Sequence, residues 1–568
     1  MGIATTRFDD RILAAIGGGG NARAIFDFHQ GVCGAGVLFM LPSLLMQGLL
    51  KTKEVYRLPD NHYYGLESVV LTLAFMALSR IKNPEQLKQC KPGEIGKIIG
   101  LDRSPEVRCL RGKIKLLSSQ KQAQNLNRLL IDDWHGQSSE NGVFLYIDGH
   151  VRVYHGYQAN LPAKFVSREK LCLSATTEFW VNDSKGLPVM MVMGELTEKL
   201  QQAIETLIIP ELQKTSLLPT WESEQKIIKR GTDDKNPICT LVFDREAYDI
   251  PFFKRLWDNY RIAILSYRKN VHDQWSVESF KHIDVIVLDN TITMQICERE
   301  ITLGGLQLRE IRRLTDSGHQ TSVITNNVTI SMEVAAGRMF GRWSQENFFR
   351  YMIMDYDFDK MIEYGIQAID ETKEVVNPQY RKLDYQLKKQ KEKTARQEAK
   401  LLKLVEDSIG QDLDKIPKLQ QKQSDVMDTI NQYRLKEQNI TAQRNAIDKR
   451  IKLKDMSDQN RYNRLKPESK MLMNILKMIC YRAETAVANI LAEYIGNIKE
   501  KRMLVKQIIQ TNADIYPNIE NKTLTITLHS LSAHRFNQAA EKLAEFLNQT
   551  ETIFPDTELK LIFKTTAT

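Results

Sequence analysis

The sequence predicts a mixed α/β protein with a central sheet, helical segments before it and a long helical arm after it. Between residues 143 and 270, short apolar runs alternate with amphipathic helical patterns. Residues 372–460 are instead rich in Lys, Gln, Glu and Leu, and they contain few aromatic residues. The chain has 568 residues, which is too long for one hydrophobic core. We therefore expect three or more folding units.

The order of elements in the central region defines the type of sheet. Three strand-like runs come first (VFLYIDGHVRVYHG, LCLSATTEFWVND and GLPVMMVMGEL), and the DSKG tetrapeptide between the last two is typical of a hairpin turn. A helix, a strand, a helix and a strand follow (LTEKLQQAIETLIIPELQK, CTLVFDRE, PFFKRLWDNY and RIAILSYRK). This is the order of a ribonuclease-H-like α/β core, in which the first and fourth strands are neighbours.

The flanking segments complete a predicted division of the chain into four parts. The expected parts are a helical N-terminal domain (1–135), a ribonuclease-H-like domain (140–365) with a β-rich insertion at about 272–325, a Lys/Gln-rich arm (370–465) and an α+β C-terminal domain (466–568). The arm is either an antiparallel coiled-coil hairpin or a solvated pair of helices.

A short helix followed by a basic helix at 81–120 fits either a helix-turn-helix or an ordinary helical hairpin. The basic helix supplies Arg108, Arg111 and Lys113 as candidate DNA contacts.

Composition narrows the possible classes of protein. The net charge of +9 fits a polyanionic partner without demonstrating one. Seven scattered cysteines without a CxxC pair argue against a disulfide framework or a zinc site and favour the cytoplasm. The uncharged stretch 31–50 is long enough to span a bilayer, but it contains Pro42 and four glycines, so we expect a buried helical pair and no membrane.

Two of the predicted strands end in aspartate, at Asp148 in FLYIDG and at Asp244 in CTLVFD. Neighbouring strands would bring both carboxylates to one rim of the sheet, where they repel each other unless a divalent cation binds between them. Oxygen ligands favour Mg²⁺ or Mn²⁺. Two simpler interpretations stay open, namely a hairpin turn at Asp148 and a helix cap at Asp244. Glu246 is expected to be a helix-start or loop acid.

A third acid is available in the helical pattern GRWSQENFFRYMIMDYDFD, residues 341–359. Glu346 has Arg342 four residues before it and Arg350 four residues after it, so both arginines lie one helical turn from the acid. They could hold phosphate groups beside Glu346. Considered alone, Glu346 also fits an ordinary surface acid.

These three acids and the Arg-x-x-x-Glu spacing resemble the DDE-type transposases of bacterial insertion sequences, which belong to the ribonuclease-H-like/retroviral-integrase superfamily. The resemblance covers residues 143–360 and is greatest to the subgroup with a β-rich insertion before the catalytic Glu, because Asp244 and Glu346 are 102 residues apart. That subgroup carries a Tyr and a Lys at the positions of Met339 and Ile353, so contacts made by those residues are in doubt. More loosely, GLDRSPEVRCLR, GHQTSVITNN, KMICYRAETA and LHSL resemble a large uncharacterised transposase family.

The resemblance implies a transposase that binds transposon-end DNA, cleaves it by metal-dependent hydrolysis and joins the 3′-OH end to target DNA. It implies two Mg²⁺ or Mn²⁺ ions held by Asp148, Asp244 and Glu346, and a homodimer that synapses the ends near the bacterial nucleoid. No small-molecule substrate is expected. Arg342, Arg350 and Arg245 would join the basic helix as DNA contacts. Three alternatives are a nuclease without strand transfer, a catalytically silent transposase-derived DNA-binding protein, and a coiled-coil interaction protein.

Overall fold

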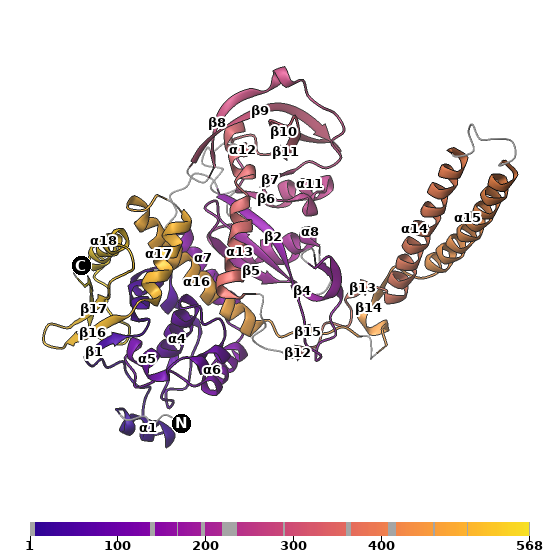
Figure 1. The fold of residues 1–568 in the computed structure, drawn as a ribbon. Helices are drawn as coiled ribbons and strands as arrows, with labels where there is room; N and C mark the ends of the chain where they lie inside the picture. The colour runs from indigo at the N-terminus through magenta and orange to yellow at the C-terminus, as the bar shows by residue number, and fades with distance from the viewer. Residues whose placement is uncertain are drawn as a thin grey trace. The chain divides into compact units, whose positions relative to one another are not determined.

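The fold is taken from a computed structural model (Figure 1). It describes residues 6–136, 143–166, 169–194, 199–218, 236–287, 290–358, 365–406, 416–457, 461–496 and 498–566, without the side chains of 343–346 and 498. The chain divides into two compact units. The first contains Met1–His155, Ala163–Gly365 and Leu465–Thr568, and the second contains Gly156–Pro162 and Ile366–Arg464. The four-part division predicted from sequence stays a prediction.

A ten-stranded sheet organises the first unit, with strand order β3-β4-β2-β6-β7-β11-β10-β9-β8 and β5 paired to β4. The strands are β2 (Val143–Val153), β3 (Ala163–Val166), β4 (Leu171–Asn182), β5 (Pro188–Met193), β6 (Cys239–Phe243), β7 (Ile262–Tyr267), β8 (Lys281–Val287), β9 (Asn290–Leu303), β10 (Leu306–Leu314) and β11 (Gln320–Thr325). β2, β6 and β7 run parallel to one another, whereas β4 is antiparallel to β2 and β5 is antiparallel to β4.

β2 does not end at Asp148, which corrects the sequence-based prediction. Its parallel ladder with β6 ends at the Tyr146–Val242 pair, but its antiparallel ladder with β4 continues as far as Val153. Asp148 is therefore inside the strand and has no strand partner on its β6 side. The hairpin-turn interpretation of Asp148 is wrong for the same reason.

The β-rich segment extends the same sheet. β11 pairs antiparallel with β7, and β10, β9 and β8 follow in order. Two buried asparagines just after β11 hold this junction together. Asn326 Oδ1 accepts a hydrogen bond from the Ile264 amide (2.7 Å), and Asn327 Nδ2 donates one to Thr240 Oγ1 (2.9 Å).

Residue alternation separates the two faces of the sheet at β2 and β6. Leu145, Ile147, Leu241 and Phe243 pack in one core with the helical segment Leu200–Leu212 (α8, η4 and α9) and α11 (Ile250–Tyr260). Phe144, Tyr146 and Val242 belong to a second core with α12 (Met332–Phe340). Because side chains alternate along a strand, even-numbered positions of β2 and β6 share the α12 face.

The N-terminal and C-terminal parts of the first unit share a sheet and a core. β1 (His29–Val32) pairs with β16 (Ala513–Asn518), followed in order by β17 (Thr523–Leu528) and β18 (Lys560–Thr565). The helices and short turns around them are α1 (Phe8–Ala15), η1 (Ala35–Met40), α2 (Leu41–Met46), η2 (Leu49–Lys51), α3 (Thr52–Val55), α4 (Leu66–Leu78), α5 (Pro92–Ile98), α6 (Val107–Ser119), α7 (Ala123–Gly136), α16 (Glu468–Ile490), α17 (Ile498–Gln510) and α18 (His534–Asn548).

The apolar stretch 31–50 forms short buried helices in this shared core. A Cβ on Gly36 would lie 1.9 Å from the carbonyl oxygen of Ile508, so only glycine fits this close approach. Within the described residues, no continuous helix has the length and apolar character of a membrane span, and one bent pair (Ala35–Met46 with Leu49–Val55) meets these criteria only when its two parts are taken together.

The second unit is built on two long helices, α14 (Pro378–Glu406) and α15 (Ile416–Asn445) (Figure 1). Ion pairs between Arg434 and Glu398 (2.8 Å) and between Arg444 and Asp384 (3.0 Å) show that the helices run antiparallel. The short strands β13 (Glu374–Val376) and β14 (Arg450–Lys452) pair next to the helices. β12 (Ile366–Gln367) and β15 (Arg464–Leu465) lie at the ends of the segment.

Candidate active site

Strand register brings Asp148 and Asp244 to the same face of the sheet. In the parallel ladder Tyr146 is opposite Val242, and each aspartate lies two residues further along its own strand. A step of two residues preserves the face, so both carboxylates belong to the face covered by α12. Adjacent strands are about 4.8 Å apart, which places the two acids close enough to interact electrically.

The carboxylate of Asp148 is poorly compensated for its degree of burial. Its side chain is 20% exposed, and its Oδ1 accepts a hydrogen bond from the Gly149 amide (2.9 Å). Among the described residues, the nearest ion-pair partner is Arg342, whose Nη2 lies 3.7 Å from Oδ2, which is too long for a hydrogen bond. Burial raises the pKa of Asp148 to about 6, with Arg342 opposing and Asp244 adding to the increase.

Asp244 caps the short helix η5 (Arg245–Ala247), and so the helix-cap interpretation is confirmed. Its Oδ1 accepts a hydrogen bond from the Glu246 amide (2.8 Å). Capping does not exclude a second role, because a carboxylate has two oxygens and within the described residues no hydrogen bond to the other one is found. The Ser266 hydroxyl also donates to the Asp244 carbonyl oxygen (3.2 Å), which fixes the turn after β6.

Glu346 lies on α13 (Trp343–Tyr356), and its side chain is outside the described residues. The helix itself is located by its neighbours. Arg342, immediately before it, reaches Asp148, and Phe349 stacks on His150 with ring centroids 5.5 Å apart. α13 therefore crosses β2 beside Asp148. Among the described side chains, no three His, Cys, Asp or Glu residues are close enough to hold a metal ion.

The structure separates the expected DNA contacts into exposed and buried groups. Arg350, Arg245 and Arg108 are exposed, as is Arg111, which pairs with Glu85 (2.9 Å). Arg342 is buried and faces Asp148.

Lys113 is only 5% exposed, and its Nζ lies 2.8 Å from His62 Nδ1. It occupies the packed side of α6, away from the exposed Arg108 and Arg111. As placed, Lys113 is not available to a phosphate group.

Sequence reasoning underestimated Glu246. Although Glu246 is exposed, its pKa is raised by partial desolvation and then by the charges of Asp244 and Asp148, with Lys164 and Lys269 opposing. The carboxyl group of Glu246 thus belongs to the same electrostatic cluster as the two aspartates. The available signal was its position two residues after the end of a strand that already carried one acid.

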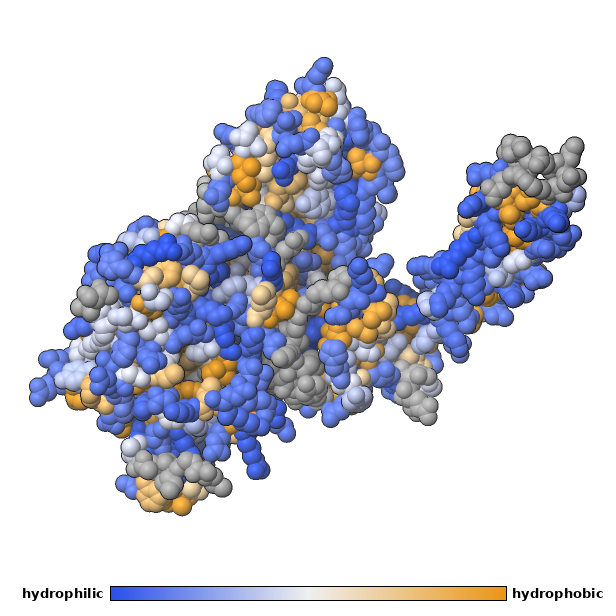
Figure 2. All heavy atoms as spheres, viewed as in Figure 1, coloured by the Kyte–Doolittle hydropathy of each residue, from blue (hydrophilic) through white to orange (hydrophobic). Residues whose placement is uncertain are grey.

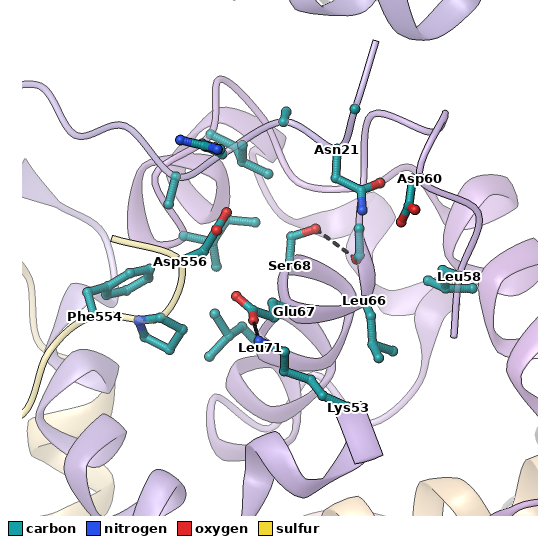
Figure 3. A pocket seen from close by; sticks show the side chains of 18 of the residues that line it. Asn21, Lys53, Leu58, Asp60, Leu66, Glu67, Ser68, Leu71, Phe554 and Asp556 are labelled. Carbon is teal, nitrogen blue, oxygen red and sulfur yellow. Dashed lines mark hydrogen bonds and ion pairs between the residues drawn. The ribbon is translucent and has the colours of Figure 1, made fainter. Parts of the chain in front are cut away.

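A separate pocket of about 640 Å³ lies among residues from both ends of the chain (Figure 3). Its lining combines Lys53 and Arg57 with Glu67, Asp60 and Asp556, and Lys53 pairs with Glu67. Since charges of both signs line it, the pocket does not select an anionic or a cationic ligand. It contains none of the site residues predicted from sequence.

Comparisons with known proteins identify the family. A solved structure, the cryo-EM structure of a piggyBac transposase synaptic complex with hairpin DNA, matches with 11% identity and a TM-score of 0.29, covering 55% of this chain and 68% of that one. This similarity is too low to support an inference about this chain. No curated protein sequence matches. A family model described as "Transposase protein" matches residues 2–567, and the chain therefore belongs to this transposase family.

Proposed function

We propose that this transposase is a metal-dependent enzyme of the DDE type, which cleaves transposon-end DNA and joins the freed 3′-OH to target DNA. The observation that carries the proposal is the parallel pairing of β2 with β6, whose register directs Asp148 and Asp244 to one face beside α13. Family membership supports the class of protein, and this pair of carboxylates supports the chemistry.

The strand order also supports a ribonuclease-H-like core. Within the sheet, five neighbouring strands lie in the order β5-β4-β2-β6-β7. The first three pair antiparallel with one another, and β6 and β7 continue parallel to β2. This is the arrangement that the order of elements in the sequence predicted. The segment α8–α9 lies between β5 and β6 in the chain, α11 connects β6 to β7, and both pack on the opposite face from the acids.

The donor set fits a hard divalent cation. Two carboxylates share a face, the pKa of Asp148 is raised, and its nearest cation is 3.7 Å away, so a bound cation would relieve a charge conflict that the chain itself leaves in place. We assign Asp148, Asp244 and Glu346 as ligands for two Mg²⁺ or Mn²⁺ ions. Bound there, such ions would lower the pKa of a water molecule and would stabilise charge on the phosphoryl oxygens.

The protein's own residues would orient the DNA and hold the acids in position. The cap made by Asp244 uses one of its oxygens and leaves the other for a cation, and the Gly149 amide donates a hydrogen bond to Asp148. Arg350, exposed on α13, and Arg245, exposed after β6, would contact phosphate groups of the bound DNA. A protein-bound covalent intermediate is not required, because water and then the 3′-OH are the nucleophiles.

A second DNA contact is proposed on α6. A shallow groove of about 730 Å³ along this helix is lined by Arg108, Gly112 and Lys115, and also by Glu106 and part of the mostly buried Lys113. Apart from Gly112's chain neighbours and the backbone of its own helix, no described atom lies within 4 Å of the position a Cβ would take on Gly112, so this side of the helix is open to a partner. We therefore replace the buried Lys113 with the exposed Lys115 in the proposed contact. α5 and α6 would form the helix-turn-helix.

The deciding experiment is a strand-transfer assay with a labelled transposon-end duplex, a target plasmid and Mg²⁺. Wild type should give both cleaved and joined products, and Asp244→Asn should lose both. Glu246→Gln is the matched control, since it removes a neighbouring acid that we do not assign as a ligand. Inverted repeats flanking the gene would supply the end sequence and support the assignment to a mobile element.

Each alternative has its own outcome in this assay. Cleavage without joined product would overturn the transposase mechanism in favour of a nuclease. DNA binding without cleavage would indicate a catalytically silent relative. Retained cleavage in Asp244→Asn would show that the proposed metal site is wrong. Product that depends on mixing two differently tagged copies of the chain would support the expected homodimer.

A further inference from the structure

The outer surface of α14 has a charge pattern that the proposed active site does not explain. Its packed and half-packed positions recur at alternating three- and four-residue steps, namely Tyr380, Leu383, Leu387, Gln390, Thr394, Gln397, Leu401 and Leu404. This is the heptad spacing of a helix that packs along one seam. The two seam positions therefore assign every other residue of α14 to one of the five remaining positions of the seven-residue repeat.

Basic residues occupy one pair of adjacent heptad positions along this helix. They form a stripe of six residues, all exposed: Lys382, Lys389, Lys393, Arg396, Lys400 and Lys403. They are separated by steps of seven, four, three, four and three residues, which keep them on one side of the helix. The only other residues at these two positions are glutamines, Gln379 and Gln386. The stripe contains no acid.

The acids of the helix are placed elsewhere and are partly neutralised. Glu398 pairs with Arg434 and Asp384 pairs with Arg444, both across the seam to α15. Within the described part of the chain, no carboxylate lies within ion-pair distance of the six stripe residues. α15 differs, because two exposed aspartates, Asp425 and Asp428, lie between its exposed lysines Lys422 and Lys436. The stripe on α14 thus presents charge of a single sign, whereas the exposed acids Glu392 and Glu406 lie at other positions of that helix.

We propose that the α14 stripe binds the phosphate backbone of duplex DNA independently of base sequence. This inference rests on the proposed function, which identifies DNA as the partner. It adds the surface of the protein that binds this DNA. The stripe extends over 21 residues, or about 32 Å at 1.5 Å per residue, which is close to one turn of B-DNA at about 34 Å. The arm surface visible in Figure 2 is predominantly hydrophilic.

A phosphate backbone suits this surface better than a site that reads bases. The six side chains are long, flexible and exposed, and five of them are lysines, which bind phosphate as point charges without the planar fork of arginine. Phosphate contacts position a protein on DNA but carry no sequence information. The stripe would therefore strengthen binding to any duplex, while recognition of the transposon end would depend on other residues.

The test compares two triple variants of the full chain that change the net charge by the same amount. Lys389→Gln/Lys393→Gln/Lys400→Gln removes three charges from the stripe. Lys418→Gln/Lys422→Gln/Lys436→Gln removes three exposed charges from α15. Glutamine has nearly the helix propensity of lysine, so both hairpins should keep their helical content, which circular dichroism checks. Affinity for a 40-base-pair duplex of unrelated sequence is measured between 50 and 300 mM KCl.

The slope of log affinity against log salt concentration should become shallower by about 3 in the α14 variant and change little in the α15 variant, because each lost phosphate contact removes about 0.9 from the slope. Equal changes of this slope in the two variants would overturn the proposed role of the stripe and would indicate only a general effect of net charge. So would an unchanged slope in the α14 variant. Loss of binding to anionic lipid vesicles or to RNA, with DNA binding retained, would also overturn it.

This experiment separates the stripe from the proposed function on which it rests. If wild type binds no duplex DNA at any salt concentration, the proposed function fails first. If wild type binds and cleaves DNA but the α14 variant keeps its salt dependence, only the stripe is wrong. Cleavage of a short end fragment at low salt should persist in both variants, because neither alters the residues around Asp148.

Discussion

Two buried carboxylates lie beside opposite ends of α13, and the protein treats them differently. Glu484, on α16, is fully buried and accepts hydrogen bonds from Arg80 Nη2 (2.8 Å), the Tyr351 hydroxyl and the Tyr356 hydroxyl (2.6 Å). Asp148, near the start of α13, has one backbone donor and an arginine at 3.7 Å. Among the described residues, the charge at Glu484 is satisfied by hydrogen-bond donors, whereas the charge at Asp148 is not.

This contrast distinguishes a structural acid from the acid that we propose as a metal ligand. Burying a charge is tolerated when partners with good geometry surround it, as at Glu484. A buried carboxylate left short of partners next to a second carboxylate is typical of a site that binds a cation or transfers a proton. The comparison also explains the stretch KMICYRAETA, which contains Glu484 and Lys477. Lys477 Nζ donates to the Tyr356 carbonyl oxygen (2.8 Å), so this stretch fixes the end of α13.

The largest expected effect is a loss of stability on changing Glu484. Glu484→Gln leaves the guanidinium of Arg80 buried without its full counter-charge, and breaking a buried pair in this way costs about 3–5 kcal/mol. Denaturant unfolding of the full chain measures it. Adding Arg80→Met to the same protein should recover part of the loss. A single variant within 0.5 kcal/mol of wild type would contradict the structural role.

At Asp148 we expect the opposite result above neutral pH, because removing this charge should increase the free energy of unfolding. Its pKa is raised from 3.8 to about 6, so the folded state holds this proton more tightly than the unfolded state. Stability from this group is therefore greatest below pH 4 and falls as the pH rises to about 6, by at most about 3 kcal/mol. Asp148→Asn removes this penalty. Without divalent cations, the variant should be more stable than wild type at pH 8.

The same variant supplies its own control at low pH. At pH 4 the wild-type carboxyl group is mostly protonated, so the difference in free energy of unfolding between Asp148→Asn and wild type should nearly disappear. The Arg342 guanidinium loses its partner in the variant, which makes the predicted gain an upper limit. Denaturant unfolding of both proteins at pH 4, 6 and 8 in EDTA measures how this difference in free energy depends on pH. A variant that is less stable than wild type at pH 8 would show that Asp148 is structural like Glu484.

A divalent cation should stabilise the wild-type chain and do so more at pH 8 than at pH 5. Binding to the folded state alone contributes about 2.7 kcal/mol at a concentration one hundred times the Kd. Thermal unfolding with and without Mg²⁺ or Mn²⁺ measures the effect. It should disappear in Asp148→Asn and Asp244→Asn and persist in Glu246→Gln and Glu484→Gln. Loss of the effect in Glu246→Gln, with retention in Glu346→Gln, would make Glu246 the third ligand.

The elements of this site could be predicted from sequence better than its side-chain environment. The strand pattern identified Asp148 and Asp244 because apolar runs and their alternation are local features. The length of β2 depends on the ladder with β4, and the contact of Arg342 with Asp148 joins residues far apart in sequence; neither is encoded locally. Lys113 is different, because it lies three residues after Leu110 and four before Leu117, on the apolar side of α6. Its burial could have been predicted.

The smallest expected effect extends the comparison to an exposed carboxylate. Glu398 pairs with Arg434 at 2.8 Å, as short as the contact from Arg80 to Glu484, but the two side chains are 43% and 59% exposed. Water and salt screen such a pair, so Glu398→Gln should cost no more than a few tenths of a kcal/mol and nothing at 1 M salt. Thermal unfolding followed by circular dichroism measures it. A loss approaching that of Glu484→Gln would mean that pairing distance, and not burial, distinguishes the acids of this protein.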